Sequence, residues 1–224
     1  MNAAAGLSVS LATIEPGFTD PVFDSQAAFR AALEAMSRPG KILALPAPEA
    51  APAPLAPAAA ALLLALCDPD TRLWISPSFA AAAAYLCFHT GCPITMNRAD
   101  ADFALIDGVR GIGPLDAWRS GTEDYPDRST TLIVQVAGLG GSDAVSPAGG
   151  GAVMSASGVP LRLSGPGVDG AAQIVIAGGH REFIDQLLAR KRLFPRGNDF
   201  FFACGGSIAA LPRSTVVEAD PACM

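Results

Sequence analysis

Apolar residues recur along the chain at spacings that predict helices alternating with strands. A spacing of three to four residues predicts a helix over residues 24–37, with Phe29, Leu33 and Met36 on one face. Asp24 can cap its start, and Arg38-Pro39-Gly40 ends it because proline disfavours a helical residue before it. Further helices are expected at 58–67, 77–88 and 181–191, the last with Phe183, Ile184, Leu187 and Leu188 facing inward.

Short apolar runs between these helices predict strands. The run over 131–137 is almost continuously apolar and β-branched, as expected of a strand that is covered on both faces. Interleaved helices and strands favour an α/β fold in layers, and the closely spaced strands near the end favour antiparallel pairs within a mixed sheet. The other expected strands are 41–45, 72–75, 103–106, 160–164, 174–176, 199–204, 208–211 and 215–218, with a helical turn at 115–118.

A chain of 224 residues suits one domain with its own core. We expect residues 1–14 to be a flexible tail and residues 15–224 to form a single α/β domain. The start of the chain is a poor signal peptide because no basic residue precedes its small residues, and no apolar run reaches membrane-spanning length. An odd number of cysteines without a regular framework favours reduced thiols in the cytoplasm; they are Cys67, Cys87, Cys92, Cys204 and Cys223.

Half of the residues are apolar, and the mean hydropathy of +0.36 is high for a soluble monomer. An obligate partner surface would explain this excess, and so would the abundance of alanine. The net charge of -6 argues against nucleic-acid binding, which needs clustered basic residues. The charge is uneven, because residues 181–213 hold six basic and three acidic residues and are net +3, which leaves -9 for the rest.

Arginine dominates the basic residues, since only Lys41 and Lys191 among the 15 are lysines. Arginine suits bidentate contacts with carboxylates or phosphates, although a high genomic GC content gives the same bias. Both lysines lie in polar or turn contexts, whereas a Schiff base needs a desolvated lysine. We therefore expect no pyridoxal phosphate.

Residues with obvious chemistry are sparse. Cys87, His89 and Cys92 are zinc-ligand types, but a fourth ligand is missing and free cysteine often packs as a small apolar residue, so we expect no metal. His180 precedes a helix and could act as a general base or phosphate contact, or be an ordinary helix-start residue. The glycine-rich loop at 138–151 follows the best strand but matches neither the dinucleotide-binding nor the P-loop pattern.

Arginines beside proline and glycine are the other candidate contacts. Arg196, in the turn Phe194-Pro195-Arg196-Gly197, could present its guanidinium to an anion or to a partner carboxylate. Arg38 and Arg213 have similar surroundings, and with Arg196 and His89 they form the set of candidate ligand or partner contacts. We expect these arginines to matter more for assembly or ligand contact than for folding. No catalytic residue is assigned, because the sequence offers neither a glycine-flanked serine nor a convincing acidic pair.

Four groups of short motifs carry a family resemblance. They are GFTDPV at 17–22 leading to Arg38-Pro39-Gly40, LCFHT at 86–90 with Asp102-Phe103-Ala104, LRLSGPG at 161–167, and FPRGND at 194–199 with ALPRST at 210–215. In order and spacing along most of the chain they resemble the PhnH family, whose members are subunits of the carbon–phosphorus lyase core complex. The glycine-rich stretch 140–151 is longer than that resemblance leads us to expect.

The resemblance implies a three-layer α/β sandwich with a mixed β-sheet, similar to the large domain of PLP-dependent transferases but without that cofactor's lysine. It implies a complex with subunits G, I and J, of which the last carries out the radical iron–sulfur chemistry. With subunits G, I and L, such proteins support the displacement of adenine from ATP by an alkylphosphonate, which gives ribose 1-alkylphosphonate 5-triphosphate. The family supplies no catalytic residue and no cofactor to carry over.

Three functional hypotheses follow. The first is a non-catalytic or co-catalytic subunit of that assembly. The second is a stand-alone enzyme in which His89 or His180, with arginines such as Arg196, acts on a phosphonate or nucleotide. The third is a small-molecule binding module. The apolar excess and the uneven charge favour a homodimer that has no turnover without its partner subunits.

Overall fold

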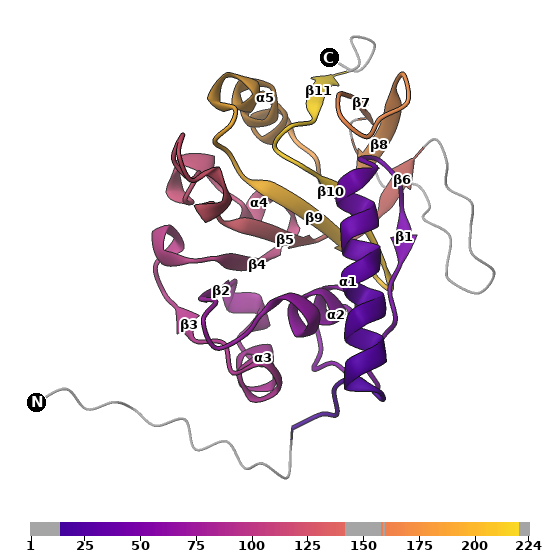
Figure 1. Cartoon of the computed structure of the whole chain (residues 1–224), viewed down its shortest axis with the longest axis vertical. Coiled ribbons are helices and arrows are strands. Elements are labelled where there is room, and N and C mark those ends of the chain that lie inside the picture. The colour runs from indigo at the N-terminus through magenta and orange to yellow at the C-terminus, as the bar shows by residue number, and fades with distance from the viewer. Residues whose placement is uncertain (1–13, 142–157, 159, 220–224) are drawn as a thin grey trace, which may run out of the picture.

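The computed structural model describes residues 14–141, 158 and 160–219, and two β-sheets organise them (Figure 1). The expected tail, apart from residue 14, and the loop residues 142–151 lie outside these described residues. None of the described helices combines the length and apolarity that crossing a bilayer requires.

A seven-stranded mixed sheet forms the middle of the molecule, with strand order β1-β10-β9-β5-β4-β2-β3. The five strands from β3 to β9 are parallel, and β10 runs antiparallel to both β9 and β1. The strands are β1 (Leu43–Ala44), β2 (Leu73–Ile75), β3 (Ile94–Thr95), β4 (Phe103–Asp107), β5 (Thr131–Gln135), β9 (Asp199–Cys204) and β10 (Ser207–Leu211).

Successive rows of side chains across this sheet point to opposite faces and pack into two separate hydrophobic cores. Leu105, Ile133 and Phe201 are opposite one another in register and belong to the core on one face. The next row, which includes Val134 and Phe202, belongs to the core on the other face. Because side chains along a strand alternate between faces, an apolar run such as 131–137 is needed to fill both cores.

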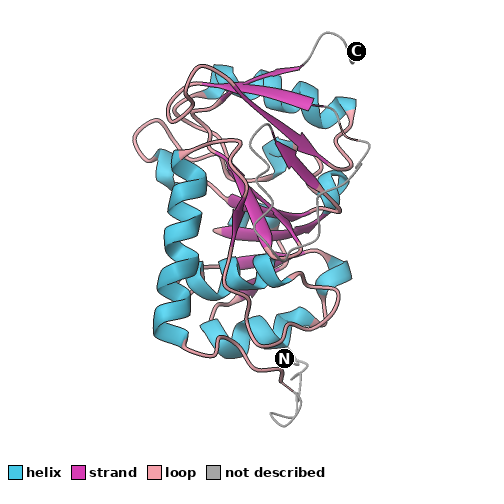
Figure 2. Cartoon of the chain, turned by 90° about the vertical axis from the view of Figure 1, so that its right-hand side faces the viewer, coloured by secondary structure: helices cyan, strands magenta, loops and turns pink. Residues whose placement is uncertain are grey.

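Three helices cover the first face: α1 (Pro21–Ser37), α2 (Pro57–Leu66) and α3 (Ala82–Thr90) (Figures 1 and 2). Their buried surface is rich in alanine, which allows backbones to approach closely. On α1 the buried residues are Ala28, Ala32 and Ala35, and α2 buries the run 58–63. The predicted helix 77–88 divides into a 3₁₀ turn at Pro77–Phe79 and α3.

The start of α1 and its outward face correct two expectations. Asp20, not Asp24, caps the helix, because its carboxylate accepts hydrogen bonds from Val22 and Phe23 while Pro21 occupies the first helical position. Phe29 and Leu33 do share a side of α1, but that side points outward and leaves them 45% and 54% exposed.

The second face is covered by a four-stranded antiparallel sheet together with α4 (Gly108–Gly111) and α5 (Arg181–Arg190). The strand order is β11-β7-β8-β6, with β6 (Leu139–Gly141), β7 (Pro160–Ser164), β8 (Ala172–Ile176) and β11 (Val216–Ala219). Phe183 and Leu187 of α5 are buried in this core, whereas Leu188, which was expected to face inward, is 39% exposed. The α/β sandwich with a mixed sheet is thus confirmed, and the second sheet is an addition that the sequence did not reveal.

The turn between β7 and β8 touches the end of α1 at Gly167. A Cβ at this position would lie 2.0 Å from the carbonyl oxygen of Ser37, and its φ of +80° disfavours any side chain. Gly170, in the same turn, has φ +68° but open space around it. Substitution of Gly170 therefore introduces backbone strain alone, whereas substitution of Gly167 introduces both strain and a steric clash with α1.

We predict that Gly167→Ala lowers the free energy of unfolding by at least about 3 kcal/mol, because strain and collision add. Gly170→Ala should cost about 1–2 kcal/mol, from left-handed backbone strain alone. Urea unfolding followed by circular dichroism measures both. Equal losses in the two variants would show that the turn moves away from α1 at little cost.

Candidate functional site

In open α/β sheets, ligands commonly bind outside the carboxyl ends of the parallel strands. Here the chain's own backbone occupies the polar side chains of Gln135 and Ser76 at that edge. The side chain of Gln135, at the end of β5, accepts a hydrogen bond from the amide of Ala56 at 2.7 Å and donates one to the carbonyl of Pro54 at 2.8 Å. The hydroxyl of buried Ser76 accepts a hydrogen bond from the amide of Asp107 at 3.2 Å.

A hollow opens beyond the end of β4, between α4 and the start of α5. Its volume is about 230 Å³ with open solvent included, which is below the ~300–1,000 Å³ typical of small-molecule sites. The side chain of Gln186 stabilises one wall of the hollow, because it accepts a hydrogen bond from the amide of Leu115 and donates one to the carbonyl of Gly113. The lining consists of Val109, Arg110, Gly113, His180, Glu182, Phe183 and Gln186. Its charged and imidazole groups can contact a small polar molecule, but the space does not suit ATP.

The two histidines both face backbone carbonyls. His180 lies at the start of α5 with its Nδ1 3.4 Å from the carbonyl oxygen of Gly178. His89 lies in the last turn of α3, and its Nε2 is 3.0 Å from the carbonyl oxygen of Glu15. A Cβ on Gly17 would be 3.1 Å from the ring, so His89 holds the segment that leads into α1.

The predicted cysteine–histidine set is divided between two places. The thiols of Cys67 and Cys92 interact, and this interaction raises the pKa of Cys67 and lowers the pKa of Cys92. Burial raises the pKa of Cys87, and the neighbouring Cys92 raises it further. Among residues 14–141, 158 and 160–219, no three or more His, Cys, Asp or Glu side chains are grouped so that they could hold a metal ion.

Arg213 is held inside the molecule instead of reaching solvent. Its Nε lies 3.2 and 3.1 Å from the two carboxylate oxygens of Asp199, and the two side chains are only 16% and 15% exposed. The guanidinium also donates to the hydroxyl of Ser129 at 2.7 Å and to the carbonyl of Pro126. These contacts join the loop before β11 to the loop before β5, so the Arg213 side chain is largely buried among groups of its own chain.

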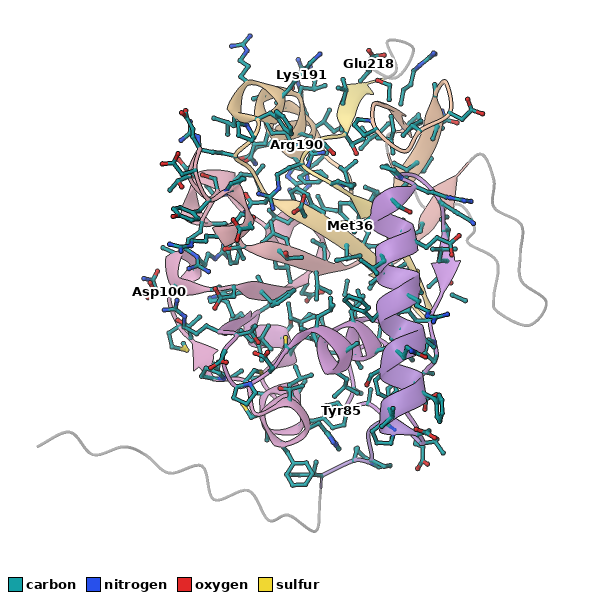
Figure 3. All side chains as sticks on the ribbon, in the orientation of Figure 1. Met36, Tyr85, Asp100, Arg190, Lys191 and Glu218 are labelled. Carbon is teal, nitrogen blue, oxygen red and sulfur yellow. The ribbon has the colours of Figure 1, made fainter. Side chains whose placement is uncertain are left out.

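Arg190 is a second buried arginine, and it was not among the arginines expected from the sequence to make important contacts. Its Nη2 donates to the carbonyl oxygens of Pro212 at 2.9 Å and Thr215 at 3.3 Å. Its guanidinium lies 5.5 Å from the ring centre of Phe200, and burial lowers its pKa to about 10. Figure 3 shows Arg190 turned inward and the neighbouring Lys191 at the outer surface. The helical spacing from Phe183 to Leu187 to Arg190 could have placed it on the buried side.

Arg38 and Arg196 differ from these buried arginines. Arg38 is exposed at the end of α1, and Arg196 is half-buried in its turn. Neither guanidinium makes a hydrogen bond or ion pair with the described part of the chain. Of the four candidate contacts, these two have guanidinium groups available to a ligand or partner.

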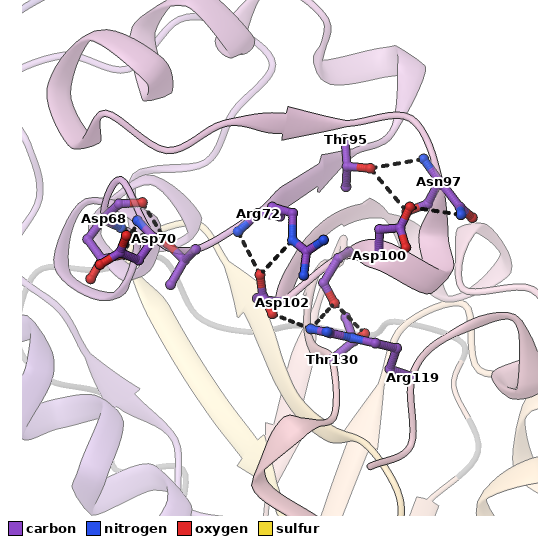
Figure 4. A network of polar contacts seen from close by, with 11 residues as sticks. Asp68, Asp70, Arg72, Thr95, Asn97, Asp100, Asp102, Arg119 and Thr130 are labelled. Carbon is purple, nitrogen blue, oxygen red and sulfur yellow. Dashed lines mark hydrogen bonds and ion pairs between the residues drawn. The ribbon is translucent and has the colours of Figure 1, made fainter.

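A polar network ties together the amino ends of the parallel strands (Figure 4). The carboxylate of Asp102, just before β4, accepts the amide of Arg72 at 2.8 Å and pairs with the guanidinium of Arg119. The side chain of Asn198, just before β9, donates to the carbonyls of Arg119 and Thr130 at 2.8 and 2.9 Å. Burial works to raise the pKa of Asp102, but the bonds from Arg72 and Arg119 outweigh it and hold that pKa below its usual 3.8.

Comparison with known proteins identifies the relatives of this chain. A sequence profile described as "Bacterial phosphonate metabolism protein (PhnH)" matches residues 16–218. The chain is 36% identical over 205 residues to a Rhizobium meliloti (strain 1021) protein named "Alpha-D-ribose 1-methylphosphonate 5-triphosphate synthase subunit PhnH", covering 91% of this chain and 94% of that protein. It is 27% identical over 195 residues to the "Putative C-P lyase subunit protein HtxG" of Stutzerimonas stutzeri, covering 86% and 85% of the two chains. These matches confirm the family resemblance seen in the sequence.

We predict that Arg213→Ala lowers the free energy of unfolding by about 2–4 kcal/mol, because it leaves the carboxylate of Asp199 largely buried and unpaired. Arg196→Ala is the matched control and should change stability by less than about 0.5 kcal/mol. Thermal and urea unfolding measure both. A stable Arg213→Ala protein that fails only in complex formation would contradict this prediction and support the contact role expected from the sequence.

We predict that Asp102→Asn destabilises the protein by about 1–2 kcal/mol at neutral pH. Because folding lowers the pKa of Asp102, its charge stabilises the native state above pH 3.8 and loses that effect as acid protonates the folded carboxylate. The difference between the variant and the unaltered protein should therefore shrink below about pH 4. Unfolding curves from pH 3 to pH 7 test this, and a constant difference across that range would contradict it.

Proposed function

Since the chain belongs to the PhnH family of bacterial phosphonate metabolism proteins, we propose that it is a subunit of the carbon–phosphorus lyase machinery. Its role is to support the formation of ribose 1-alkylphosphonate 5-triphosphate from ATP and an alkylphosphonate. It acts there with subunits G, I and L, and joins subunits G, I and J in the core complex. It is a cytoplasmic protein that forms a homodimer when its partners are absent.

The observation that carries this proposal is the 36% identity, which extends over 91% of this chain and 94% of a relative named as a synthase subunit. The second relative is likewise named as a subunit, and its name places it in C–P lyase.

The geometry around the two histidines favours a non-catalytic subunit over a stand-alone enzyme. An enzyme built on His89 needs its imidazole to face a nucleophile or substrate, but the Nε2 of His89 is held against the carbonyl oxygen of Glu15 in its own chain. The hollow beside His180 is also smaller than a typical small-molecule site. The reacting groups are therefore expected on the partner subunits, with this chain contributing structure or contacts.

We predict that the purified chain releases no adenine from ATP and methylphosphonate above a blank. A mixture of subunits G, I and L should release adenine when this chain is added, and omission of the chain should return the rate to the blank level. Adenine separated by chromatography is the measurement, and His89→Ala and His180→Ala are the controls that should still support the reaction. Adenine release by the chain alone, lost in either histidine variant, would replace the subunit role with an enzymatic one.

A further inference from the structure

The outward side of α1 carries large apolar side chains that the described residues of the chain leave uncovered. Val22, Phe23, Phe29 and Leu33 are 74%, 69%, 45% and 54% exposed, and we call them, with Gln26, the α1 outer face. The opposite side of the helix buries only alanines. Figure 2 shows α1 along the left-hand edge of the molecule, so this face is accessible. A cluster of large apolar side chains on one helix is typical of a protein–protein contact.

The spacing along this face is symmetric. Val22, Gln26, Phe29 and Leu33 follow one another at intervals of four, three and four residues, which keeps them on one stripe of the helix. The pattern reads the same in both directions about a point between residues 27 and 28. An antiparallel copy of α1 therefore brings Val22 of one chain opposite Leu33 of the other, and Gln26 opposite Phe29.

The charges at the two ends of the stripe are complementary under the same reversal. Asp20 and Glu49 lie at the start, where the hydroxyl of Thr19 donates to the carboxylate of Glu49 at 3.1 Å. Arg38 lies at the other end, exposed and without an ion pair to the described residues. In the antiparallel pair of helices, Arg38 of one copy lies opposite Gly17 of the other, beside the acidic residues at the start of that copy's α1. Opposite charges and opposed helix dipoles both favour this orientation.

We propose that the α1 outer face is the twofold interface of the homodimer, with the two α1 helices packed antiparallel. A self-complementary patch of this kind closes with one partner and does not propagate, as a twofold contact requires. The apolar stripe supplies the buried centre, and Arg38 with the acidic start supplies a polar rim. This proposal deepens the homodimer part of the proposed function and leaves the subunit role to the adenine assay.

Light scattering at micromolar concentration tests the interface directly. The unaltered protein should have twice the 22.8 kDa chain mass. Phe29→Ser combined with Leu33→Ser should raise the dimer dissociation constant at least about 100-fold, because both residues occur twice in the interface. Met96→Ser is the matched control, since Met96 is 91% exposed but lies beyond β3, and it should remain dimeric. Circular dichroism confirms that each variant is folded, and Arg38→Glu, which spares the apolar stripe, should weaken the dimer most at low salt.

Cross-linking tests the orientation. A mixture of Val22→Cys and Leu33→Cys chains should be joined rapidly by a short bis-maleimide, with the unaltered chain and its native cysteines as background. Val22→Cys alone should not be joined above background, since in the antiparallel pair its two copies lie about 16 Å apart along the helices. A monomeric unaltered protein, a Phe29→Ser/Leu33→Ser protein that stays dimeric, or equal cross-linking of Val22→Cys alone would each overturn the proposal. Capture of one of the subunits G, I and J by this face in an otherwise monomeric protein would assign the face to that partner instead.

Discussion

Burial of the central strands on both faces is the constraint on which the rest of the structure depends. β4, β5 and β9 have almost no position where a polar side chain can remain, because each row of residues enters one of two cores. Polar groups are therefore displaced to the strand ends. At the amino ends Asp102 and Asn198 align neighbouring strands, and at the carboxyl ends Gln135 fastens a loop. Polar residues at the strand ends are thus used to hold the sheet and its loops in place.

The central architecture could be predicted because local composition determines it. The run at 131–137 contains enough apolar and β-branched residues to identify a strand without knowledge of its neighbours. The second sheet could not be predicted as a separate sheet, because only its β7–β8 pair is local, while the β6–β8 and β11–β7 pairs join strands that lie far apart in the sequence. For the same reason, no local signal shows that Arg213 also meets Pro126 and Ser129, which lie 87 and 84 residues before it in the loop ahead of β5.

Periodicity identified which residues of α1 share a side but not which side is buried. Phe29 and Leu33 look like core residues by size, yet Ala28 and Ala32 occupy the buried side. Alanine allows α1 to lie close to α2 and to the sheet, and a larger residue there would push the helix away. The candidate arginines likewise differ in burial, which the sequence did not reveal. Arg213 proved to be internal, whereas Arg38 and Arg196 have guanidinium groups without a partner in the described part of the chain, and that distinction depends on tertiary contacts that the sequence does not display.

Both outer strands of the seven-stranded sheet are very short. β1 and β3 contain two residues each, so few unpaired backbone amides and carbonyls are presented along either edge. Long exposed edges invite strand addition and amyloid-like growth, and shortening them is a common protection against it. A chain that is half apolar, and that has apolar side chains on its surface, would be at particular risk of such growth. The short edges therefore direct association towards side-chain surfaces, where the shape and charge of a partner can be discriminated, and away from the indiscriminate hydrogen bonding of β-aggregation.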